Sequence, residues 1–537
     1  MLFQTSFFVY DDCLNSVRMK TRKSIFSLLL FLALLAGCTP ESPSVSSEES
    51  FQGGTITFYA INDFHGAVKQ SSSNKEPGIL SLGTFLKGKG EEENTVLINS
   101  GDMFQGAIES NYNNGRLLVD CMNEIEFDCF TLGNHEFDWG LRILKENKLR
   151  RAETDGYQVP WLAANIYNYD NEAKAEGTIQ QSDLGDFYTI KTLENGLKLG
   201  IIGMIGFNQW TSITSWYVDD VVFKDPAPLV KSLSDELRTQ KGCDIVALDI
   251  HADQDDVIDT GITAVSPVSK EKYVDIVFCA HSHQKETTTK NGVLFTQNEA
   301  YGRNISQVTM TVDKDKNVTS SKLKTLDYFD VINSVGKNYD PNLKQLVDTY
   351  GAESSAAGNE VLGTMEGGYM DRYSNLPNML AEAMLQEAER EGYSPALAMV
   401  NNCRKNIDQG PITYSDVYEA VPFDNEVWVI NCDGADILKE AGYDTNLIAR
   451  AENNAIVSGR TYQIAIIDYL AFHKSTKRVY DYFPSISLVG VLGAEGKDAH
   501  YRHILADYIR EQGTIRYNDY SSSSWRHNKE LLGQGRS

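Results

Sequence analysis

Between Thr55 and Leu326 the chain alternates short apolar runs with longer amphipathic stretches. Short apolar runs fit buried strands, and the longer stretches between them fit helices. The alternation therefore predicts an α/β domain in which helices cover a sheet. Five of the runs constrain the fold further, because each is followed by polar residues that can bind a metal ion. They are Thr55 to Ile61, Val96 to Ile98, Phe127 to Leu132, Ile245 to Ile250 and Val274 to Ala280.

The polar residues after these runs are histidines, carboxylates and amides. They form the strings Asn62-Asp63-Phe64-His65, Gly101-Asp102, Gly133-Asn134-His135-Glu136, His251 and His281-Ser282-His283. Five of the nine histidines of the chain stand in these strings. Loops at strand ends aim side chains into a shared crevice, so we expect one site rather than five. In Asp63-x-His65, alternating side chains on one face of an extended segment could converge on one ion, but loops also form such pairs by chance.

The same strings carry a family resemblance. "INDFHG", "SGDMFQG", "GNHEFDWG" and "CAHSHQ" resemble the 5'-nucleotidase branch of the dinuclear metallophosphoesterases, which includes UDP-sugar hydrolases and 2',3'-cyclic-nucleotide phosphodiesterases. The resemblance covers most of residues 55–330 and continues more weakly beyond them. It implies an α/β fold with a calcineurin-like metallophosphoesterase β-sandwich flanked by helices. A smaller α+β C-terminal domain of the 5'-nucleotidase type would follow.

The resemblance also implies a ligand set for two divalent metal ions. One ion would be bound by Asp63, His65, Asp102 and His283, and the second by Asp102, Asn134, His251 and His281. Asp102 would then bridge the ions, which is chemically sensible because one shared carboxylate can hold two mutually repelling cations. Mixed imidazole, carboxylate and amide ligands suit Zn²⁺, Mn²⁺ or Fe without choosing among them.

The resemblance places His135 and Asp138 at the substrate instead of at the metal. In the family the matching histidine contacts the phosphoryl group and the matching aspartate orients it. An aspartate bonded to one ring nitrogen fixes the tautomer and favours a proton on the other nitrogen. The alternative for Asp138 is a carboxylate at the start of a helix. Glu136 is assigned no role. The expected reaction is attack on phosphorus by a water that the ions acidify.

In the C-terminal part the resemblance is weaker. "YSDVYEAVPFDNEVWVINCDGADIL" resembles the Pro-Phe-x-Asn region of the family's nucleoside pocket and makes Phe423 a candidate for stacking on a base, with a core phenylalanine as the alternative. "VNNCRKNIDQGPIT" departs from a glycine-rich segment, so Asn401, Asn402 and Arg404 are approximate equivalents only. Tyr469 is the candidate for the second aromatic, although "YLAFHKSTKR" lacks the family's Gly-Gly-Asp-Gly turn. We therefore expect an altered nucleoside pocket.

The N-terminus resembles a bacterial lipoprotein signal over residues 19–37. A basic segment precedes the apolar stretch Ile25 to Leu35, which is too short to span a bilayer, and Leu-Ala-Gly-Cys ends at Cys38. Cys38 would be the lipidated residue and would anchor the protein to the membrane of the cell envelope, at the periplasmic face or the cell surface. Residues 1–18 are expected to be a misassigned upstream extension, and residues 38–54 a flexible tether.

The remaining chain is expected to form a catalytic domain over residues 55–330, a helical polar linker over 331–358 and a 5'-nucleotidase-like substrate domain over 359–537. The substrate domain should contain a helix from Leu376 to Glu391 and strands from Glu426 to Cys432 and from Tyr462 to Tyr469. Cys121 and Cys129 could form a disulfide in an exported protein, but buried free thiols are favoured.

The formal net charge of -25 bears on the partners of the chain. A nucleic-acid polymer would be repelled, whereas a small phosphorylated substrate is compatible with this charge if metal ions invert the local field. We expect an exported metal-dependent phosphohydrolase that acts on nucleoside 5'-monophosphates or related nucleotides. The alternatives are an esterase for UDP-sugars, 2',3'-cyclic nucleotides or non-nucleotide phosphates, and a non-enzymatic nucleotide-binding surface lipoprotein. No oligomeric state is predicted.

Overall fold

The computed structural model describes residues 51–168, 181–207, 209–218, 220–440, 446–449, 456–471, 483, 486–493 and 500–520. The predicted extension, the signal segment and Cys38 lie outside the described residues, as do residues 521–537 and all but the end of the tether. Within the described ranges, no helix combines the length and the apolar character needed to cross a membrane.

The first six-stranded sheet has the strand order β14-β13-β1-β2-β3-β4. Its strands are β1 (Gly54–Ile61), β2 (Thr95–Asn99), β3 (Cys129–Thr131), β4 (Trp161–Leu162), β13 (Asn304–Val312) and β14 (Val318–Asp327). β1 to β4 run parallel to one another, whereas β13 pairs antiparallel with both β1 and β14. The parallel strands therefore end at a common edge of this sheet.

The second six-stranded sheet has the order β11-β12-β10-β9-β7-β6. Its strands are β6 (Tyr188–Thr192), β7 (Lys198–Ile205), β9 (Ile245–His251), β10 (Ile276–Phe278), β11 (Glu286–Lys290) and β12 (Val293–Gln297). The four inner strands are parallel, and β6 and β11 are antiparallel at the edges. A separate two-stranded ladder joins β5 (Ile166–Asn168) to β8 (Val221–Phe223). The five apolar runs of the sequence are thus β1, β2, β3, β9 and β10.

The two large sheets pack face to face over a buried apolar layer. Ile56, Phe58 and Ala60 of β1 belong to this layer, together with residues of β9 and β10. The intervening Tyr59 and Ile61 belong to a second apolar cluster, which contains helical residues. Alternate residues of a strand point to opposite faces, so both faces of β1 are buried. A strand buried on both faces is typical of a parallel sheet covered by helices.

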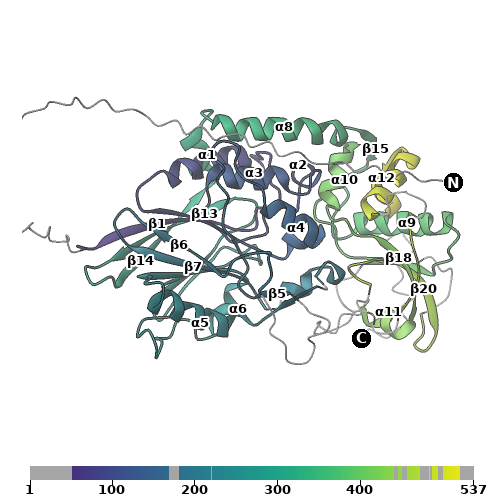
Figure 1. Cartoon of the computed structure of the whole chain (residues 1–537). Helices are drawn as coiled ribbons and strands as arrows, with labels where there is room; N and C mark the ends of the chain where they lie inside the picture. The colour runs from purple at the N-terminus through teal and green to yellow at the C-terminus, as the bar shows by residue number, and fades with distance from the viewer. Residues whose placement is uncertain are drawn as a thin grey trace, which may run out of the picture. The chain divides into compact units, whose positions relative to one another are not determined.

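Helices cover the outer faces of both sheets (Figure 1). Leu82 and Leu86 of α1 and Leu118 of α3 pack outside the first sheet, and Leu233 and Leu237 of α5 pack outside the second. The helices up to the end of this part are α1 (Gly78–Gly90), α2 (Ile108–Asn111), α3 (Arg116–Ile125), α4 (Gly140–Lys148), α5 (Pro226–Thr239), α6 (Gln254–Ile258), α7 (Tyr328–Val335) and α8 (Pro341–Gly358). The predicted β-sandwich flanked by helices is therefore confirmed.

The segment predicted as a linker, residues 331–358, is helical and packs on the sandwich. Helices α7 and α8 begin after Asp327 and Asp340, whose side chains accept hydrogen bonds from backbone N–H groups of the first turn. Leu343 of α8 is buried in the same apolar cluster as α1 and α3. Lys87 of α1 donates a hydrogen bond to Asp340 at 2.9 Å. The segment thus adds to the layer of helices that covers the first sheet. The polar pattern of the sequence does not indicate this packing.

The C-terminal part is α+β, as predicted. Its five-stranded sheet has the order β19-β16-β20-β18-β21, and its three-stranded sheet the order β17-β15-β22. The elements are β15 (Val361–Glu366), α9 (Asn375–Arg390), β16 (Leu397–Val400), β17 (Gly410–Thr413), α10 (Tyr414–Ala420), β18 (Val427–Asp433), α11 (Gly434–Glu440), β19 (Asn446–Ala449), β20 (Thr461–Ile467), β21 (Ser487–Val491), α12 (Tyr501–Gln512) and β22 (Thr514–Arg516). Leu376, Leu380 and Met384 of α9 face its core at helical spacing.

The cysteines of the described part agree with the favoured expectation of free thiols. Cys121, Cys129, Cys243, Cys279, Cys403 and Cys432 are all unpaired and buried. Burial raises the pKa of Cys121, so this thiol stays protonated at neutral pH.

Candidate metal centre

The loops after β1, β2, β3, β9 and β10 bring the predicted ligands together. Their nitrogen and oxygen atoms form three groups, each within 4.8 Å: Asp63, His65 and His283; His65, Asp102 and His135; and Asp102, His251 and His281. His65 and Asp102 each belong to two groups, so the three groups are continuous. The five polar strings of the sequence therefore meet at one place between the carboxyl ends of the two sheets.

Five of the seven predicted metal ligands have left-handed backbone conformations. The φ angles are +48° at Asp63, +47° at His65, +52° at Asp102, +83° at His281 and +59° at His283. The string Asp63-Phe64-His65 therefore lies in a loop and not on an extended segment. Left-handed conformations are unfavourable for residues with a Cβ, and such strain is characteristic of functional sites. The turn at Asp63 and His65 brings both side chains to one group, whereas His281 and His283 contribute to two different groups.

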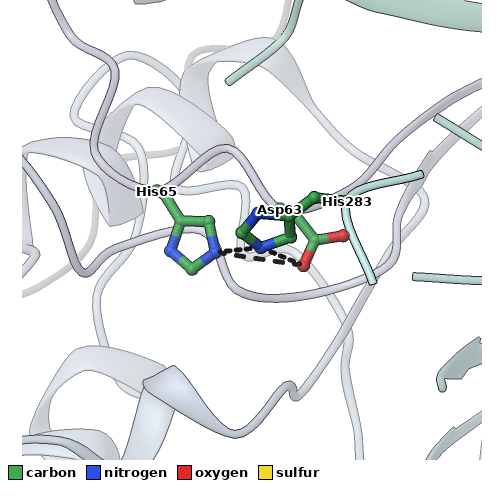
Figure 2. Close-up of side chains that lie close together, drawn as sticks. All are labelled: Asp63, His65 and His283. Carbon is green, nitrogen blue, oxygen red and sulfur yellow. Dashed lines mark hydrogen bonds and ion pairs between the residues drawn. The ribbon is translucent and has the colours of Figure 1, made fainter. Parts of the chain in front are cut away.

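The first group consists of Asp63, His65 and His283 (Figure 2). Nε2 of His65 lies 2.9 Å from Nε2 of His283 and 4.0 Å from Oδ1 of Asp63. Nε2 of His283 lies 3.5 Å from the same carboxylate oxygen. The other oxygen of Asp63 accepts hydrogen bonds from the Asn62 amide at 2.6 Å and from the backbone N–H of His281 at 3.0 Å. Those bonds orient the carboxylate toward the two imidazoles.

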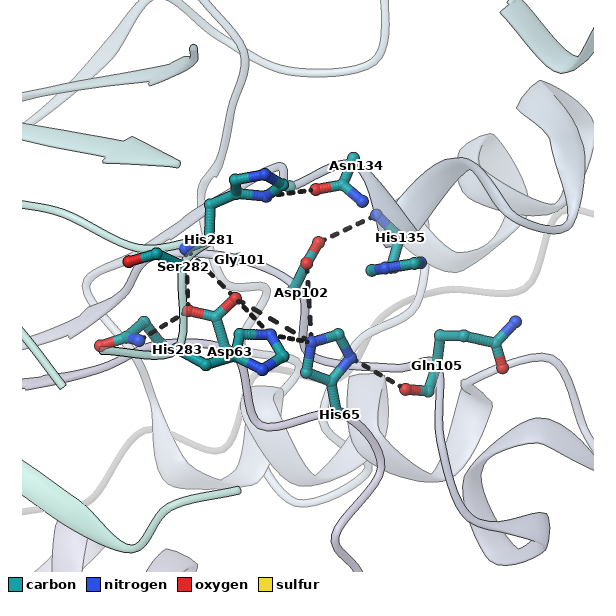
Figure 3. A network of polar contacts seen from close by, with 12 residues as sticks. Asp63, His65, Gly101, Asp102, Gln105, Asn134, His135, His281, Ser282 and His283 are labelled. Atoms are coloured by element: carbon teal, nitrogen blue, oxygen red, sulfur yellow. Dashed lines mark hydrogen bonds and ion pairs between the residues drawn. The ribbon is translucent and has the colours of Figure 1, made fainter. Parts of the chain in front are cut away.

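The group formed by Asp102, His251 and His281 is arranged around Asp102, which Figure 3 shows beside His65 and His135. Oδ2 of Asp102 lies 3.3 Å from Nε2 of His251 and 3.7 Å from Nε2 of His65. Oδ1 of Asn134 lies 3.2 Å from Nε2 of His251 and 3.0 Å from Nδ1 of His281. The Asp102 carboxylate thus lies between His65, which belongs to the group of Asp63 and His283, and His251, which belongs to the group of His281. This is the position that a bridging carboxylate requires.

The histidine tautomers show that the donor set fits cations. Nδ1 of His65 donates to the carbonyl of Gln105 at 3.1 Å, and Nδ1 of His251 donates to the carbonyl of Ser100 at 2.8 Å. Their Nε2 atoms therefore face the carboxylate and amide oxygens of the centre, where each can hold either a proton or a metal ion. Lone pairs on facing atoms repel one another unless a positive charge lies between them. Imidazoles held through their second nitrogen are typical of metal-binding histidines.

The electrostatics of the centre agree with this donor set. Burial lowers the pKa of His281 and that of His283 to about 4, so both imidazoles are neutral and able to bind a metal at physiological pH. Burial also lowers the pKa of His251, but the charge of Asp102 outweighs burial and raises this pKa to about 10. With this pKa His251 holds a second proton at neutral pH. A cation beside Asp102 would neutralise the same carboxylate and compete with that proton for Nε2 of His251.

Glu136, to which no role was assigned from the sequence, orients the Asp102 turn. Its carboxylate accepts hydrogen bonds from the backbone N–H groups of Asp102 at 2.9 Å, Met103 at 2.8 Å and Gly133 at 2.7 Å. Burial and the nearby Asp102 charge raise the pKa of Glu136 to about 7. The bond to Gly133 joins residues three apart, but the bonds to Asp102 and Met103 join residues 34 and 33 apart and have no sequence signal.

His135 and Asp138 are paired at the rim of the centre. Nδ1 of His135 lies 2.8 Å from Oδ2 of Asp138, and the backbone N–H of His135 donates to Oδ1 of Asp102 at 2.9 Å. Burial lowers the pKa of His135, but the charges of Asp138 and Asp102 outweigh it and raise the pKa above the usual value. The Asp138 bond leaves Nε2 as the nitrogen that can face a substrate.

One cavity joins this centre to the C-terminal part. Its volume is about 460 Å³, and it is lined by Asp102, Asn134, His135, Asp138, His281 and His283 on one side and by Asn401, Asn402, Arg404, Phe423 and Tyr469 on the other. All four side chains predicted to bind substrate therefore line the same cavity as four of the seven predicted metal ligands, Asp102, Asn134, His281 and His283. A cavity of this size has the volume typical of a small-molecule site.

Two of these C-terminal side chains contact His135 itself. The ring of Phe423 stacks on the imidazole, with 5.4 Å between the ring centroids and an interplanar angle of 17°. Nη2 of Arg404 lies 3.4 Å from Nε2 of His135, and its guanidinium lies 4.9 Å from the Phe423 centroid. Phe423 also packs against the C-terminal core. Phe423 thus lines the cavity and also contacts the core, while its stacking on a base stays a prediction.

Two protein-family models match the chain. Residues 56–285 match the calcineurin-like phosphoesterase domain, and residues 361–441 match the C-terminal domain of 5'-nucleotidase. The first match contains all the predicted metal ligands. The second contains Asn402, Arg404 and Phe423, but ends before Tyr469.

Individual relatives resemble both parts. The chain is 27% identical over 409 residues to the endonuclease YhcR of Bacillus subtilis, covering 71% of this chain but only 32% of that protein. It is 25% identical over 484 residues to a 5'-nucleotidase of Vibrio cholerae, covering 78% of this chain and 80% of that one. A solved 5'-nucleotidase precursor from Thermus thermophilus has the same fold, with a TM-score of 0.65, 18% identity and coverage of 86% of this chain and 97% of that one.

Proposed function

Because the chain belongs to the 5'-nucleotidase family of calcineurin-like phosphoesterases, we propose that it hydrolyses nucleoside 5'-monophosphates or related nucleotides and releases phosphate. The observation that carries this proposal is the position of Asp102, which lies between His65 and His251 and lines a cavity to which both parts of the chain contribute. That arrangement supports a two-cation centre open to a phosphate ester.

The proposed metal ligands are those expected from the family resemblance. Asp63, His65, Asp102 and His283 would hold one divalent ion, and Asp102, Asn134, His251 and His281 the other. Zn²⁺ and Mn²⁺ suit this donor set. When bound, such ions withdraw charge from phosphoryl oxygens and acidify water. Glu136 supports the centre by holding the backbone of Asp102 and Gly133 in the turn that aims the bridging carboxylate.

His135 and Asp138 are the proposed catalytic pair. Asp138 holds Nδ1 of His135, so a proton on the opposite nitrogen faces the cavity and can be donated to a phosphoryl or leaving oxygen. The guanidinium of Arg404 adds a second positive charge beside that nitrogen. Together they would stabilise the negative charge that develops as the ester bond breaks.

The C-terminal side of the cavity is the proposed nucleoside site. Asn402, Arg404, Phe423 and Tyr469 line it, and aromatic walls of this kind can stack on a base. The substitution of the family's glycine-rich turns favours a modified pocket over the usual one. The alternative within the same chemistry is therefore a UDP-sugar, a 2',3'-cyclic nucleotide or a non-nucleotide phosphate ester.

Export to the cell envelope is part of the proposal and rests on the sequence. The basic segment, short apolar stretch and Leu-Ala-Gly-Cys string support a signal over residues 19–37 and lipid attachment at Cys38. Residues 38–54 would then tether the catalytic domain (55–330) and the substrate domain (359–537) to the membrane.

Phosphate release from purified protein tests the proposed activity. The full chain carrying Cys38→Ser would be loaded with Zn²⁺, Mn²⁺ or Mg²⁺ and offered mononucleotides, UDP-sugars, 2',3'-cyclic nucleotides and 4-nitrophenyl phosphate. We expect turnover that is greatest with a nucleotide. The same protein with Asp102→Ala controls for contaminating phosphatases. Absence of turnover with every ester and metal would contradict the enzyme, and equal turnover of 4-nitrophenyl phosphate would contradict nucleotide specificity.

A further inference from the structure

The stacking of Phe423 on His135 gives the C-terminal part a contact with the proposed catalytic pair. The rings are nearly parallel, at 17°, and the imidazole also makes an edge contact with the His65 ring, at a centroid distance of 5.1 Å and an angle of 68°. The hydrogen bond to Asp138 holds one nitrogen but leaves the imidazole plane free to tilt about that bond. These two ring contacts restrict this tilt.

The backbone that carries Phe423 is held from within the C-terminal part by Arg502. This side chain of α12 is buried, with 3% of the residue exposed. Its Nη1 donates to the carbonyl of Pro422 at 2.9 Å and to the carbonyl of Phe423 at 3.1 Å, and its Nη2 pairs with the carboxylate of Asp424. A buried guanidinium with three such acceptors fixes the local backbone firmly.

The same backbone is also held from the catalytic side, by Asn111. Asn111 ends α2 and is 2% exposed. Its Nδ2 donates to the carbonyl of Pro422 at 3.0 Å and to the side-chain oxygen of Gln105, while its Oδ1 accepts from the backbone N–H of Gly106 at 2.9 Å. The amide therefore connects the loop after β2 to the residue that directly precedes Phe423.

We propose that Asn111 is a positioning residue for the hydrolytic reaction: by seating Pro422 it holds the Phe423 ring against His135 and keeps the imidazole aligned with Asp138. The inference rests on the proposed role of His135. In this proposal Phe423 acts through His135 and not through the nucleoside, because the contact forms between two protein rings. Holding the Pro422–Phe423 segment in place should therefore affect the hydrolysis of every substrate that uses His135, including esters without a base.

The position of the Phe423 ring against His135 can be observed by NMR without measuring activity. In the full chain with Cys38→Ser and imidazole-labelled histidine, the His135 resonance, assigned by its loss in His135→Asn, reports the ring current of Phe423. We expect Phe423→Leu to move this resonance, and Asn111→Ala to move it in the same direction. Asn111→Asp keeps the acceptor for Gly106 but places an oxygen against the Pro422 carbonyl, so it should behave like Asn111→Ala.

Asn147→Ala is the matched control, because Asn147 is also a buried amide whose Nδ2 donates to a backbone carbonyl, that of Asn114 at 2.8 Å. This variant should lose similar stability without moving the His135 resonance. An unmoved resonance in both Asn111 variants, or an equal shift in Asn147→Ala, would overturn the inference. These readings remain valid if the protein proves to have no phosphatase activity.

Kinetics then test the consequence. We expect Asn111→Ala to lower kcat about tenfold on a mononucleotide and on 4-nitrophenyl phosphate alike, with little change in KM, since small misplacements of catalytic groups reduce rate more than binding. In the Phe423→Leu background the same substitution should have almost no further effect on kcat. Additive losses in the double variant, or a loss confined to KM for the nucleotide, would contradict the positioning role.

Discussion

The carboxylate of Asp102 lies 3.3 Å from Nε2 of His251, although the two residues come from different sheets of the sandwich. The same carboxylate oxygen of Asp102 lies 3.7 Å from Nε2 of His65. Asp102 therefore connects the ligands contributed by the two sheets. A carboxylate shared by two proposed metal sites affects the binding of both ions. Substitution of Asp102 should therefore differ in effect from substitution of a ligand that belongs to one site only.

Metal content should distinguish Asp102 from Asp63. Asp102→Ala removes an oxygen donor from both proposed sites, so we expect it to lower metal content at both. Asp63→Ala removes a donor from one site and should retain nearly half of the wild-type metal. Elemental analysis after dialysis against metal-free buffer measures both. Wild-type metal content in Asp102→Ala would show that this residue is not the bridge.

Loss of the Glu136 charge should destabilise the centre without removing a ligand. In the wild type one Glu136 oxygen accepts from Asp102 and Gly133 and the other from Met103, so Glu136→Gln can keep the first two bonds but turns an amide NH₂ toward the Met103 N–H. Leaving one buried donor unpaired costs about 1–3 kcal/mol, and we expect a loss of about this size in the free energy of unfolding. Denaturant titration measures the loss. The exposed Glu92→Gln serves as the control and should change the free energy by less than about 0.5 kcal/mol.

Substitution of the His135–Asp138 pair should separate catalysis from metal binding. His135→Asn removes the proposed proton donor but none of the proposed ligands, so we expect kcat to fall by about 10²–10⁴-fold while metal content is unchanged. Asp138→Asn should reduce kcat less, because the imidazole remains present but loses its orienting charge. Loss of metal in His135→Asn would instead place this histidine among the ligands.

A buried carboxyl in the C-terminal part should make stability depend on pH. Burial raises the pKa of Asp468 to about 8, and its Oδ2 has no hydrogen-bond partner among the described residues. The folded state therefore binds this proton more tightly than the unfolded state, whose pKa is near 3.9, and stability contributed by the group falls as pH rises between these values.

Asp468→Asn should accordingly raise Tm relative to the unsubstituted protein, by an amount that grows from pH 4 to pH 8 and then levels off. Its amide keeps the oxygen that accepts from the backbone N–H of Tyr469 at 2.6 Å. Thermal unfolding over this pH range measures the difference. The exposed Asp255→Asn should show no comparable trend, and a Tm difference that does not vary with pH would contradict the buried carboxyl as its source.

Much of the architecture can be predicted because its signals are local. The run Ile245 to Ile250 corresponds to β9 (Ile245–His251), and the expected helix from Leu376 to Glu391 corresponds to α9 (Asn375–Arg390). Apolar periodicity specifies such elements within a few residues of chain. The packing of residues 331–358 on α1 and α3 was not predicted, because a half-polar helix has the same pattern whether it crosses between domains or covers one of them.

The amino-acid sequence alone determined which strands form and which residue types follow them, since side-chain periodicity and ligand chemistry are properties of short segments. It also indicated the family and the pairing of His135 with Asp138. Only the tertiary structure decided the left-handed turns at Asp63 and Asp102, the support that Glu136 gives to both loops, and the contact of Phe423 with His135. The physical reason is that these features depend on contacts between distant segments, whose energies exist only once both sheets and the C-terminal part have packed.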